Sequence, residues 1–163
     1  MDGERRPVVV IGVGNALFSD EGVGIHIIEA LKRMELPPYV DVVDCDTNGL
    51  AVLESLDGAQ KGIIIDAVSS GGLPGTVYRL TVEGLLGMED RLLKLVSLHQ
   101  LDLIATLKLA QLTDVYRLPE DIVIIGIEAK SFATGLELTE EVRKAIPKVI
   151  DLILKEIEAY GQG

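Results

Sequence analysis

Three nearly continuous apolar runs constrain the fold of this chain more than any other feature of its sequence. They read VVVIGV at 8–13, GIIIDAV at 62–68 and IVIIGI at 122–127. Runs rich in valine and isoleucine, without a polar residue at every second position, are typical of strands buried on both faces of a sheet. Helical patterns separate them along the chain, and this alternation predicts an α/β sandwich with a largely parallel sheet.

The other elements follow from turn residues and from the spacing of apolar positions. Strands are predicted at 8–11, 40–44, 62–66, 76–80 and 122–127, and helices at 23–34, 50–56, 98–112 and 139–160. Thr139, which two glutamates follow, is the expected N-cap of the last helix. The link AVSSGGLPG between the third and fourth strands is too short to hold a helix, so the sheet is predicted to be mixed. No linker or internal repeat is evident, and we predict a single domain over residues 1–163.

Charge and cysteine content argue against several classes of function. The net charge is −11 and no cluster of basic residues is present, which argues against a nucleic-acid partner. No apolar stretch approaches the roughly 18 residues of a membrane span, and the N-terminus lacks the cleavage site of a signal peptide. Cys45 is the only cysteine, which excludes an internal disulfide and a cysteine-rich zinc site. We therefore expect a cytoplasmic protein that binds neither membranes nor nucleic acid.

Carboxylates recur just beyond the predicted strands. Asp20 and Glu21 follow the first strand, Asp46 follows the second, Asp66 ends the third, and Glu128 follows the fifth. The carboxyl ends of parallel strands meet at one edge of an open α/β sheet, where ligands bind. Carboxylates that converge there need a cation, a proton or hydrogen-bond donors to compensate them.

Two of these acids, Asp20 and Asp66, also have a structural interpretation. The loop GVGNAL at 12–17 resembles a dinucleotide-binding fingerprint, but Leu17 stands where the third glycine should be. Asp20 is best explained as the N-cap of the following helix, whereas a cap does not explain Glu21. Asp66 is either an Asx-type turn cap for the glycine-rich link or a functional group.

A metal site is one way to combine these acids with a histidine. His99 lies at the predicted start of a helix, where a lone histidine is most often a structural, hydrogen-bonded residue. Together with two carboxylates it would also suit zinc, nickel or a similar divalent ion. A serine or cysteine hydrolase is less favoured, because no G-x-S-x-G sequence is present and Cys45 lacks the context of a nucleophile.

Several short motifs, in order and along nearly the whole chain, resemble those of the nickel-iron hydrogenase maturation endopeptidases. They are GVGN (12–15), DEGVG (20–24), IDA (65–67), GLPG (72–75), SLH (97–99), GIE (126–128) and TGLELTEEV (134–142). The resemblance implies a three-layer, phosphorylase/hydrolase-like sandwich with a twisted five-stranded, mostly parallel (mixed) sheet flanked by helices. It also implies removal of a short C-terminal peptide from the hydrogenase large-subunit precursor, with the inserted nickel as the recognition mark.

The resemblance assigns roles to individual residues. Glu21, Asp66 and His99 would contact the metal, Glu21 and Asp66 would be catalytic, and Asp20 would be the neighbouring helix cap. The metal could polarise the scissile carbonyl or a water, or it could only position the substrate while a carboxylate acts as base. Nickel would arrive with the substrate, and zinc or cadmium could bind the isolated protein.

Two other functions remain open at this point. One is a Rossmann-like nucleotide or small-molecule binding domain without proteolytic activity, which nucleotide should stabilise thermally. The other is a non-catalytic scaffold that senses nickel on a partner. The endopeptidase is expected to act as a monomer on the large-subunit precursor.

Overall fold

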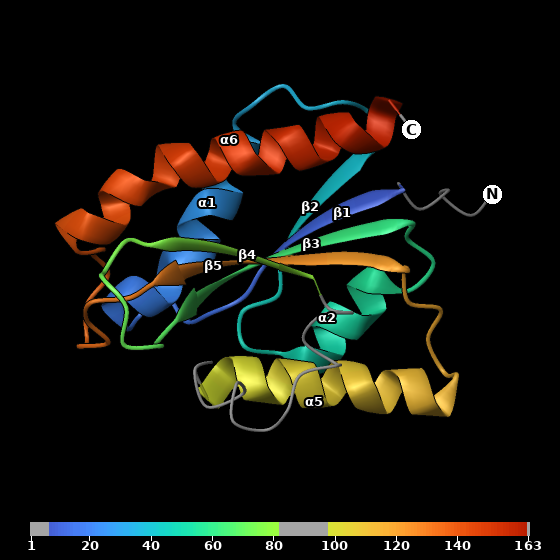
Figure 1. Cartoon of the computed structure of the whole chain (residues 1–163), viewed down its shortest axis with the longest axis horizontal. Helices are drawn as coiled ribbons and strands as arrows, with labels where there is room; N and C mark the ends of the chain where they lie inside the picture. Colours follow the sequence, from blue (N-terminus) through green and yellow to red (C-terminus); the bar gives the residue numbers. More distant parts are fainter. Residues whose placement is uncertain (1–6, 82–97, 163) are drawn as a thin grey trace.

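A five-stranded mixed sheet forms the centre of the molecule (Figure 1). The computed structural model describes residues 7–81 and 98–162, with the side chains of 98–104 left undescribed. The strands are β1 (Val8–Gly12), β2 (Val40–Asp44), β3 (Lys61–Val68), β4 (Val77–Thr81) and β5 (Asp121–Glu128). Their order is β2-β1-β3-β5-β4, and β4 alone runs antiparallel, beside β5. The predicted mixed sheet is thereby confirmed.

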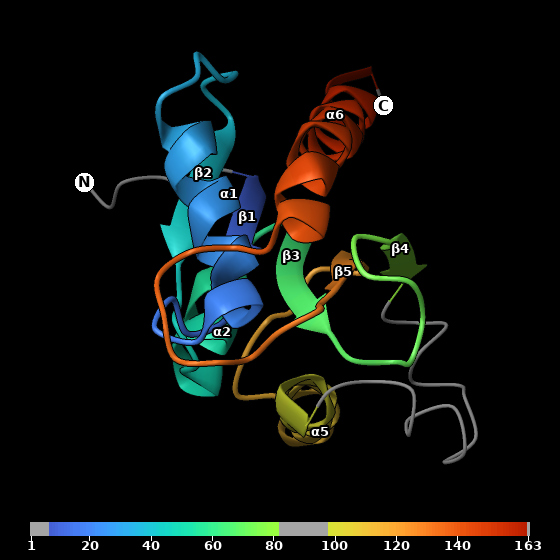
Figure 2. The ribbon, with the colours of Figure 1, turned by 90° about the vertical axis from the view of Figure 1, so that its left-hand side faces the viewer.

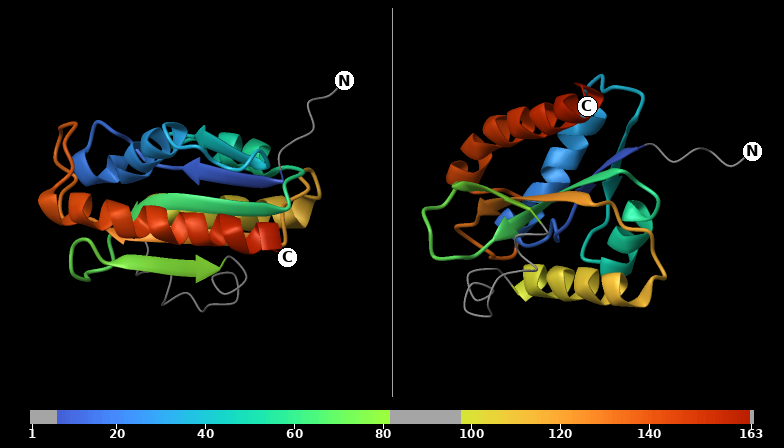
Figure 3. Two further views of the ribbon diagram at one scale, coloured as in Figure 1. Left: turned by 90° about the horizontal axis from the view of Figure 1, so that it is seen from above. Right: turned by 45° about the vertical axis from the view of Figure 1, so that its right-hand side comes forward.

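Helices cover both faces of this sheet. The helices α1 (Val23–Lys32) and α6 (Glu140–Gln162) lie on one face, and α2 (Gly49–Leu56) and α5 (Leu98–Thr113) on the other (Figures 1 and 3). A short 3-10 helix, η1 (Ser19–Gly22), precedes α1. In the part of the chain described, no helix is both long enough and apolar enough to cross a membrane. The three-layer α/β prediction is confirmed.

The apolar runs divide their side chains between two cores, because successive residues of a strand point to opposite faces. Alternate residues of β1, β3 and β5 pack against α1 and α6, and the intervening ones pack against α2 and α5. The first set includes Val10, Ile65 and Val123, and the second includes Ile11 and Ile64. Burial on both faces explains why these strands carry no regular polar alternation.

The predicted bounds hold to within two residues, and one of the differences is informative. Strand β3 does not end at Asp66, because Ala67 and Val68 continue to pair with β5. Thr139 occupies the expected N-cap position of α6, and its carbonyl accepts a hydrogen bond from Arg143 N–H at 2.9 Å. Helix α2 has its own cap, since the Asn48 side chain accepts a hydrogen bond from Ala51 N–H.

At the amino edge of the sheet, a buried lysine neutralises two acids. Lys61 Nζ lies 2.8 Å from Glu156 and 3.3 Å from Asp121, and Arg79 also pairs with Glu156. Lys61 and Glu156 are both buried. Burial alone would raise the pKa of Glu156, but the bonds from Arg79 and Lys61 outweigh it and lower the pKa. The ionised pair is therefore retained inside the fold.

Candidate active site

The site is built around Asp66, which lies inside β3 and not at its end. Asp66 stands opposite Gly126 of β5 and is only 2% exposed. One carboxyl oxygen, Oδ1, accepts a hydrogen bond from Ala67 N–H at 2.8 Å. The other, Oδ2, is buried without a hydrogen-bond partner in the described part of the chain. An unpaired buried carboxyl oxygen is destabilising, and such groups cluster at functional sites.

The surroundings of Asp66 favour its protonated form. Burial raises the pKa of Asp66 well above its usual range, the Ala67 N–H bond opposes this, and the charge of Glu21 raises the pKa further. Glu21 is therefore close enough to Asp66 for the two carboxyl groups to interact. Glu21 lies in η1 and is 8% exposed. The structure thus brings together two of the three predicted site residues.

Glycines allow the loop that carries Glu21 to lie directly against β3. A Cβ atom on Gly14 would lie 2.0 Å from the carbonyl oxygen of Glu21 and 3.9 Å from Asp66 Oδ1, and Gly14 has φ +135°. A Cβ atom on Gly24 would lie 2.6 Å from the carbonyl oxygen of Ile65. These contacts explain why the motif GVGN…DEGVG carries glycines. They permit close backbone approach and do not form a phosphate-binding loop.

Asp20 is not the cap of α1, and that prediction is wrong. Helix α1 has Gly22 at its N-cap position, with no side-chain cap hydrogen bond. The fully buried Asp20 carboxylate instead accepts hydrogen bonds from the backbone N–H groups of Lys130, Ser131 and Thr139 at 2.7–3.0 Å. The Thr139 hydroxyl also donates to it. Asp20 therefore ties the loop after β1 to the loop after β5.

Glu128, and not Asp66, anchors the glycine-rich link. Its buried carboxylate accepts hydrogen bonds from Ser70 N–H at 2.9 Å, Gly72 N–H at 3.1 Å and the Tyr78 hydroxyl at 3.0 Å. The Ser70 hydroxyl also donates to this carboxylate. The structure therefore removes the Asx-turn explanation of Asp66, and this role of Glu128 was not predicted from the sequence. Ser70 and Glu128 are 58 positions apart, so no local pattern could predict this contact.

The third predicted metal contact lies where the side chains are undescribed. His99 falls in the first turn of α5, and its side chain is outside the described residues. Within the described residues, no group of three histidine, cysteine or acidic side chains is close enough to hold a metal ion. The carboxyl groups of Asp66 and Glu21 offer oxygen ligands of the kind that divalent ions accept. The assignment of His99 as a metal ligand stays a prediction.

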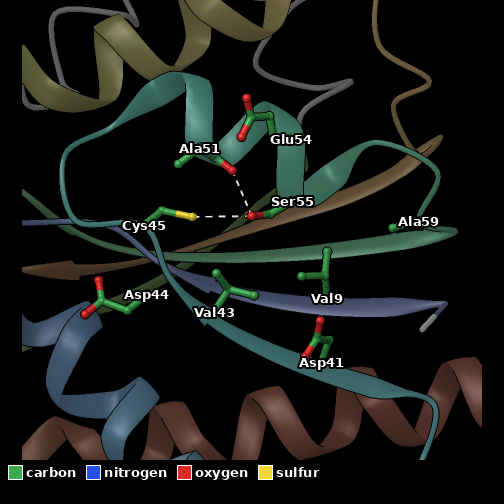
Figure 4. Close-up of a pocket in the computed structure, with 9 residues that line it drawn as sticks. All are labelled: Val9, Asp41, Val43, Asp44, Cys45, Ala51, Glu54, Ser55 and Ala59. Atoms are coloured by element: carbon green, nitrogen blue, oxygen red, sulfur yellow. Dashed lines mark hydrogen bonds between the residues drawn. The ribbon is translucent and has the colours of Figure 1, made fainter. Parts of the chain in front are cut away.

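The pocket near Cys45 is separate from this pair of acids. It measures about 360 Å³ and lies between β2 and α2, bordered by Asp44, Glu54 and Ser55 (Figure 4). Burial raises the pKa of the Cys45 thiol, the contact with Ser55 at 3.5 Å opposes this, and the charge of Asp44 raises it again. The thiol is therefore poorly activated as a nucleophile, which agrees with the sequence-based argument against a cysteine hydrolase.

Comparison with known proteins decides between the functions left open. A family model described as hydrogenase maturation protease matches residues 25–156. The hydrogenase 2 maturation protease of Escherichia coli is 31% identical over 156 residues, covering 94% of this chain and 92% of the relative. The chain belongs to the hydrogenase maturation protease family. HoxM, a hydrogenase expression/formation protein of Cupriavidus necator, is 36% identical over 155 residues, 90% of this chain and 73% of that protein.

Solved structures agree with this family assignment. The hydrogenase maturating endopeptidase HybD from Escherichia coli has a TM-score of 0.80 at 30% identity, covering 94% of this chain and 93% of that chain. The hydrogenase 2 maturation peptidase of a Thaumarchaeota archaeon has a TM-score of 0.68 at 37% identity, covering 92% and 97%. This hydrogenase maturation protease is therefore a peptidase, and a nucleotide-binding domain without proteolytic activity is not favoured.

Proposed function

We propose that this protease removes a short C-terminal peptide from the large-subunit precursor of a nickel-iron hydrogenase after nickel has been inserted. The observation that carries the proposal is the buried Asp66 carboxyl group, with one oxygen unpaired and Glu21 beside it, in a member of this family. Two nearby carboxyl groups suit a site that a cation completes. The cation in question is the nickel that the precursor brings.

Nickel fits the chemistry of these side chains. Asp66 and Glu21 would supply oxygen ligands, and His99 a nitrogen ligand, to an ion held mainly by the precursor. A cation at this position would favour the ionised form of Asp66, so that binding of loaded precursor would release a proton. Precursor without nickel would lack this contact with the two carboxyl groups and bind more weakly. This difference is the physical basis for recognising a loaded substrate.

Two routes to hydrolysis are compatible with these residues. In one, nickel polarises the scissile carbonyl or lowers the pKa of a bound water. In the other, nickel only positions the peptide, and Glu21 or Asp66 acts as base on a water. The proposal places the reaction in the cytoplasm, with one protease monomer on each precursor.

The direct test is the intact mass of a precursor incubated with the protease. We expect the mass to fall by one C-terminal peptide when the precursor carries nickel, and to stay unchanged when it does not. Glu21→Gln should slow this cleavage by about 100-fold or more. Glu140→Gln is the matched control, since Glu140 is an exposed acid that pairs with Lys144, and it should cleave at the wild-type rate. An unchanged mass with wild-type protease and loaded precursor would refute the proposed function.

The variants separate the role of Glu21 from the function itself. If wild-type protease cleaves and Glu21→Gln cleaves equally fast, the function stands and the role given to Glu21 is wrong. Zinc or cadmium added to the isolated protease provides a second measurement, because the same ligands should bind these ions. Titration calorimetry should detect that binding in the wild type and weaker binding in Glu21→Gln.

A further inference from the structure

Exposed apolar side chains gather at the carboxyl edge of the sheet. Six of the ten large apolar side chains that are exposed in the described residues lie in the loops or helix start that follow β1, β2, β3 and β5. They are Leu17, Phe18, Leu50, Leu73, Phe132 and Leu136. Figure 2 faces this edge of the molecule. An apolar surface of this kind, next to a site, is a mark of contact with another protein.

Four of these side chains belong to two loops that are joined by their backbones. Phe18 forms a parallel bridge with Gly135, through Ser19 N–H to the Gly135 carbonyl and Gly135 N–H to the Leu17 carbonyl, each at 2.8 Å. Asp20 N–H also donates to the Ser131 carbonyl at 3.1 Å. In Figure 2 the loop from β5 to α6 curves around the start of α1, where these bonds form. Leu17, Phe18, Phe132 and Leu136 are therefore carried by one paired structure.

Buried polar groups hold this paired structure in one conformation. The Asp20 carboxylate binds three backbone N–H groups and a hydroxyl of the second loop, and the Ser19 hydroxyl donates to the Glu137 carbonyl at 2.8 Å. Ser19 has φ +50°, an unusual value for a residue other than glycine, which persists only where the surroundings impose it. Hydrogen bonds that fix a surface before binding reduce the entropy lost on association.

We propose that these two paired loops form the docking surface for the folded hydrogenase large-subunit precursor, with Leu17, Phe18, Phe132 and Leu136 as its apolar contacts and Asp20 as a positioning residue. The inference rests on the proposed function, because the precursor is the occupant. The surface adjoins the reacting site, since Leu17 and Phe18 directly precede η1 and the Glu21 N–H donates to the Phe18 carbonyl at 3.1 Å.

The surface lies in an acidic setting, which adds a second requirement on the partner. The exposed Glu137 is next to Leu136, and the chain as a whole carries a net charge of −11. The facing surface of the precursor should therefore be apolar at its centre and basic at its rim. Association should be faster at low ionic strength, because opposite charges steer the encounter.

The test compares two exposed leucines on different sides of the molecule. Leu136 is 64% exposed in the paired loops at the carboxyl edge of the sheet. Leu112 is 82% exposed near the C-terminal end of α5, away from these loops. Leu136→Asp should raise KM for nickel-loaded precursor at least 10-fold with kcat within about 3-fold of wild type, and a Leu17→Asp, Leu136→Asp double variant should raise it further. Leu112→Asp should leave both constants within 2-fold. Circular dichroism confirms that the variants fold.

Binding measured separately from cleavage distinguishes the two proposals. Biolayer interferometry with immobilised loaded precursor reports association whether or not the peptide is removed. If the wild type binds without cleaving, the proposed function fails while weaker binding by Leu136→Asp still supports the docking surface. If the wild type cleaves and the double variant binds and cleaves like Leu112→Asp, the docking surface is wrong and the function stands. If the wild type neither binds nor cleaves, both are wrong.

Asp20 is tested through the same constants. Asp20→Asn keeps one acceptor oxygen but replaces the other with an amide donor, which faces N–H groups that also donate. The loops should loosen, and KM should rise with kcat falling less. A fall in kcat alone, with KM unchanged, would contradict a positioning role and place Asp20 in the chemistry.

Discussion

The buried acids at the two ends of the sheet have opposite electrostatic surroundings. At the amino edge, Lys61 lies between Glu156 and Asp121, and the cations around Glu156 lower the pKa of that acid against the effect of burial. At the carboxyl edge, Asp66 has another acid beside it, and burial together with Glu21 raises its pKa. The first arrangement is complete within the chain. In the second, one oxygen of Asp66 has no hydrogen-bond partner within the described residues, and we propose that the nickel of the precursor completes the arrangement.

Not every buried acid at the carboxyl edge lacks hydrogen-bond partners as Asp66 does. Asp20 and Glu128 are also buried there, but backbone N–H groups and hydroxyls satisfy both carboxylates. They hold loops in place, whereas Asp66 retains an unpaired oxygen. Burial of an acid therefore does not identify the reacting group. We infer instead that the reacting acid is the one that lacks compensation within the described residues, which is Asp66.

Substitution of Asp66 should have the largest effect. Asp66→Asn keeps the size of the side chain and removes the ionisable oxygen, so the cleavage rate should fall by about 100-fold to 10,000-fold. The free energy of unfolding should not fall, because the substitution removes an ionisable group whose charged form is unfavourable at this buried position. Cleavage is followed by intact mass, and urea unfolding at pH 7 gives the free energy of unfolding. A variant that is both inactive and much less stable would make Asp66 a structural residue.

Substitution of Lys61 should show the reverse pattern. Lys61→Met leaves Glu156 buried with only Arg79 to pair it, and we expect the free energy of unfolding to fall by about 2–3 kcal/mol. Cleavage per folded molecule should be unchanged, because Asp66 is five positions along β3 from Lys61, roughly 16 Å away. Lys155→Met is the control, since Lys155 is an exposed lysine paired with Asp151, and it should cost at most about 1 kcal/mol. Equal losses of unfolding free energy in both variants would show that the buried Lys61 stabilises the fold no more than an exposed lysine does.

Gly14 tests whether close backbone approach builds the site. Gly14→Ala places a Cβ atom 2.0 Å from the Glu21 carbonyl oxygen and at φ +135°, so the loop must shift. We expect a loss of about 1–3 kcal/mol in stability and, because Glu21 moves, a loss of cleavage of about 100-fold. Gly71→Ala is the control, because Gly71 has φ +84° with no atom within 4 Å of the added Cβ. Backbone strain alone would make the two variants equally impaired.

The pH dependence of stability should differ in sign between the two ends, and this is the smallest expected effect. The raised pKa of Asp66 contributes stability that is present below about pH 3.9 and lost as pH rises. The lowered pKa of Glu156 contributes stability that is present above about pH 4.3 and lost as pH falls. Relative to wild type, Asp66→Asn should therefore gain stability from pH 4 to pH 7, while Glu156→Gln should lose it. Parallel trends in urea unfolding would contradict the contrast.

The sequence was a better guide to the sheet than to the loops. Valine-rich and isoleucine-rich runs predicted the central strands because burial on both faces leaves a pattern within six to eight consecutive residues. Asp66 and Glu21 could be selected because they stand beside such runs. The partners of Asp20 could not, because Thr139 lies 119 positions away and a local pattern records only neighbours. The same reason hid the role of Glu128, whose partner Ser70 is 58 positions away.

The end of β3 illustrates the same limit at shorter range. From the sequence, Asp66 was predicted to end the strand, because it is the first charged residue after GIII and a glycine-rich link follows three residues later. Ala67 and Val68 nevertheless continue the strand, since Ile127 and Glu128 of β5 extend alongside them. This extension places Asp66 inside the ladder of β3 and β5, opposite Gly126, and not at its end. A pairing between distant segments therefore produced the environment that makes Asp66 the leading candidate for the reacting acid.

The most direct test is the mass of nickel-loaded precursor after incubation with the Lys61→Met variant and with the Asp66→Asn variant, at equal concentrations of folded protease. We predict that Lys61→Met, the less stable protein, releases the C-terminal peptide at the wild-type rate, and that Asp66→Asn leaves the precursor intact. Truncation by Asp66→Asn at the rate of Lys61→Met would contradict the claim that the uncompensated acid at the carboxyl edge carries the reaction.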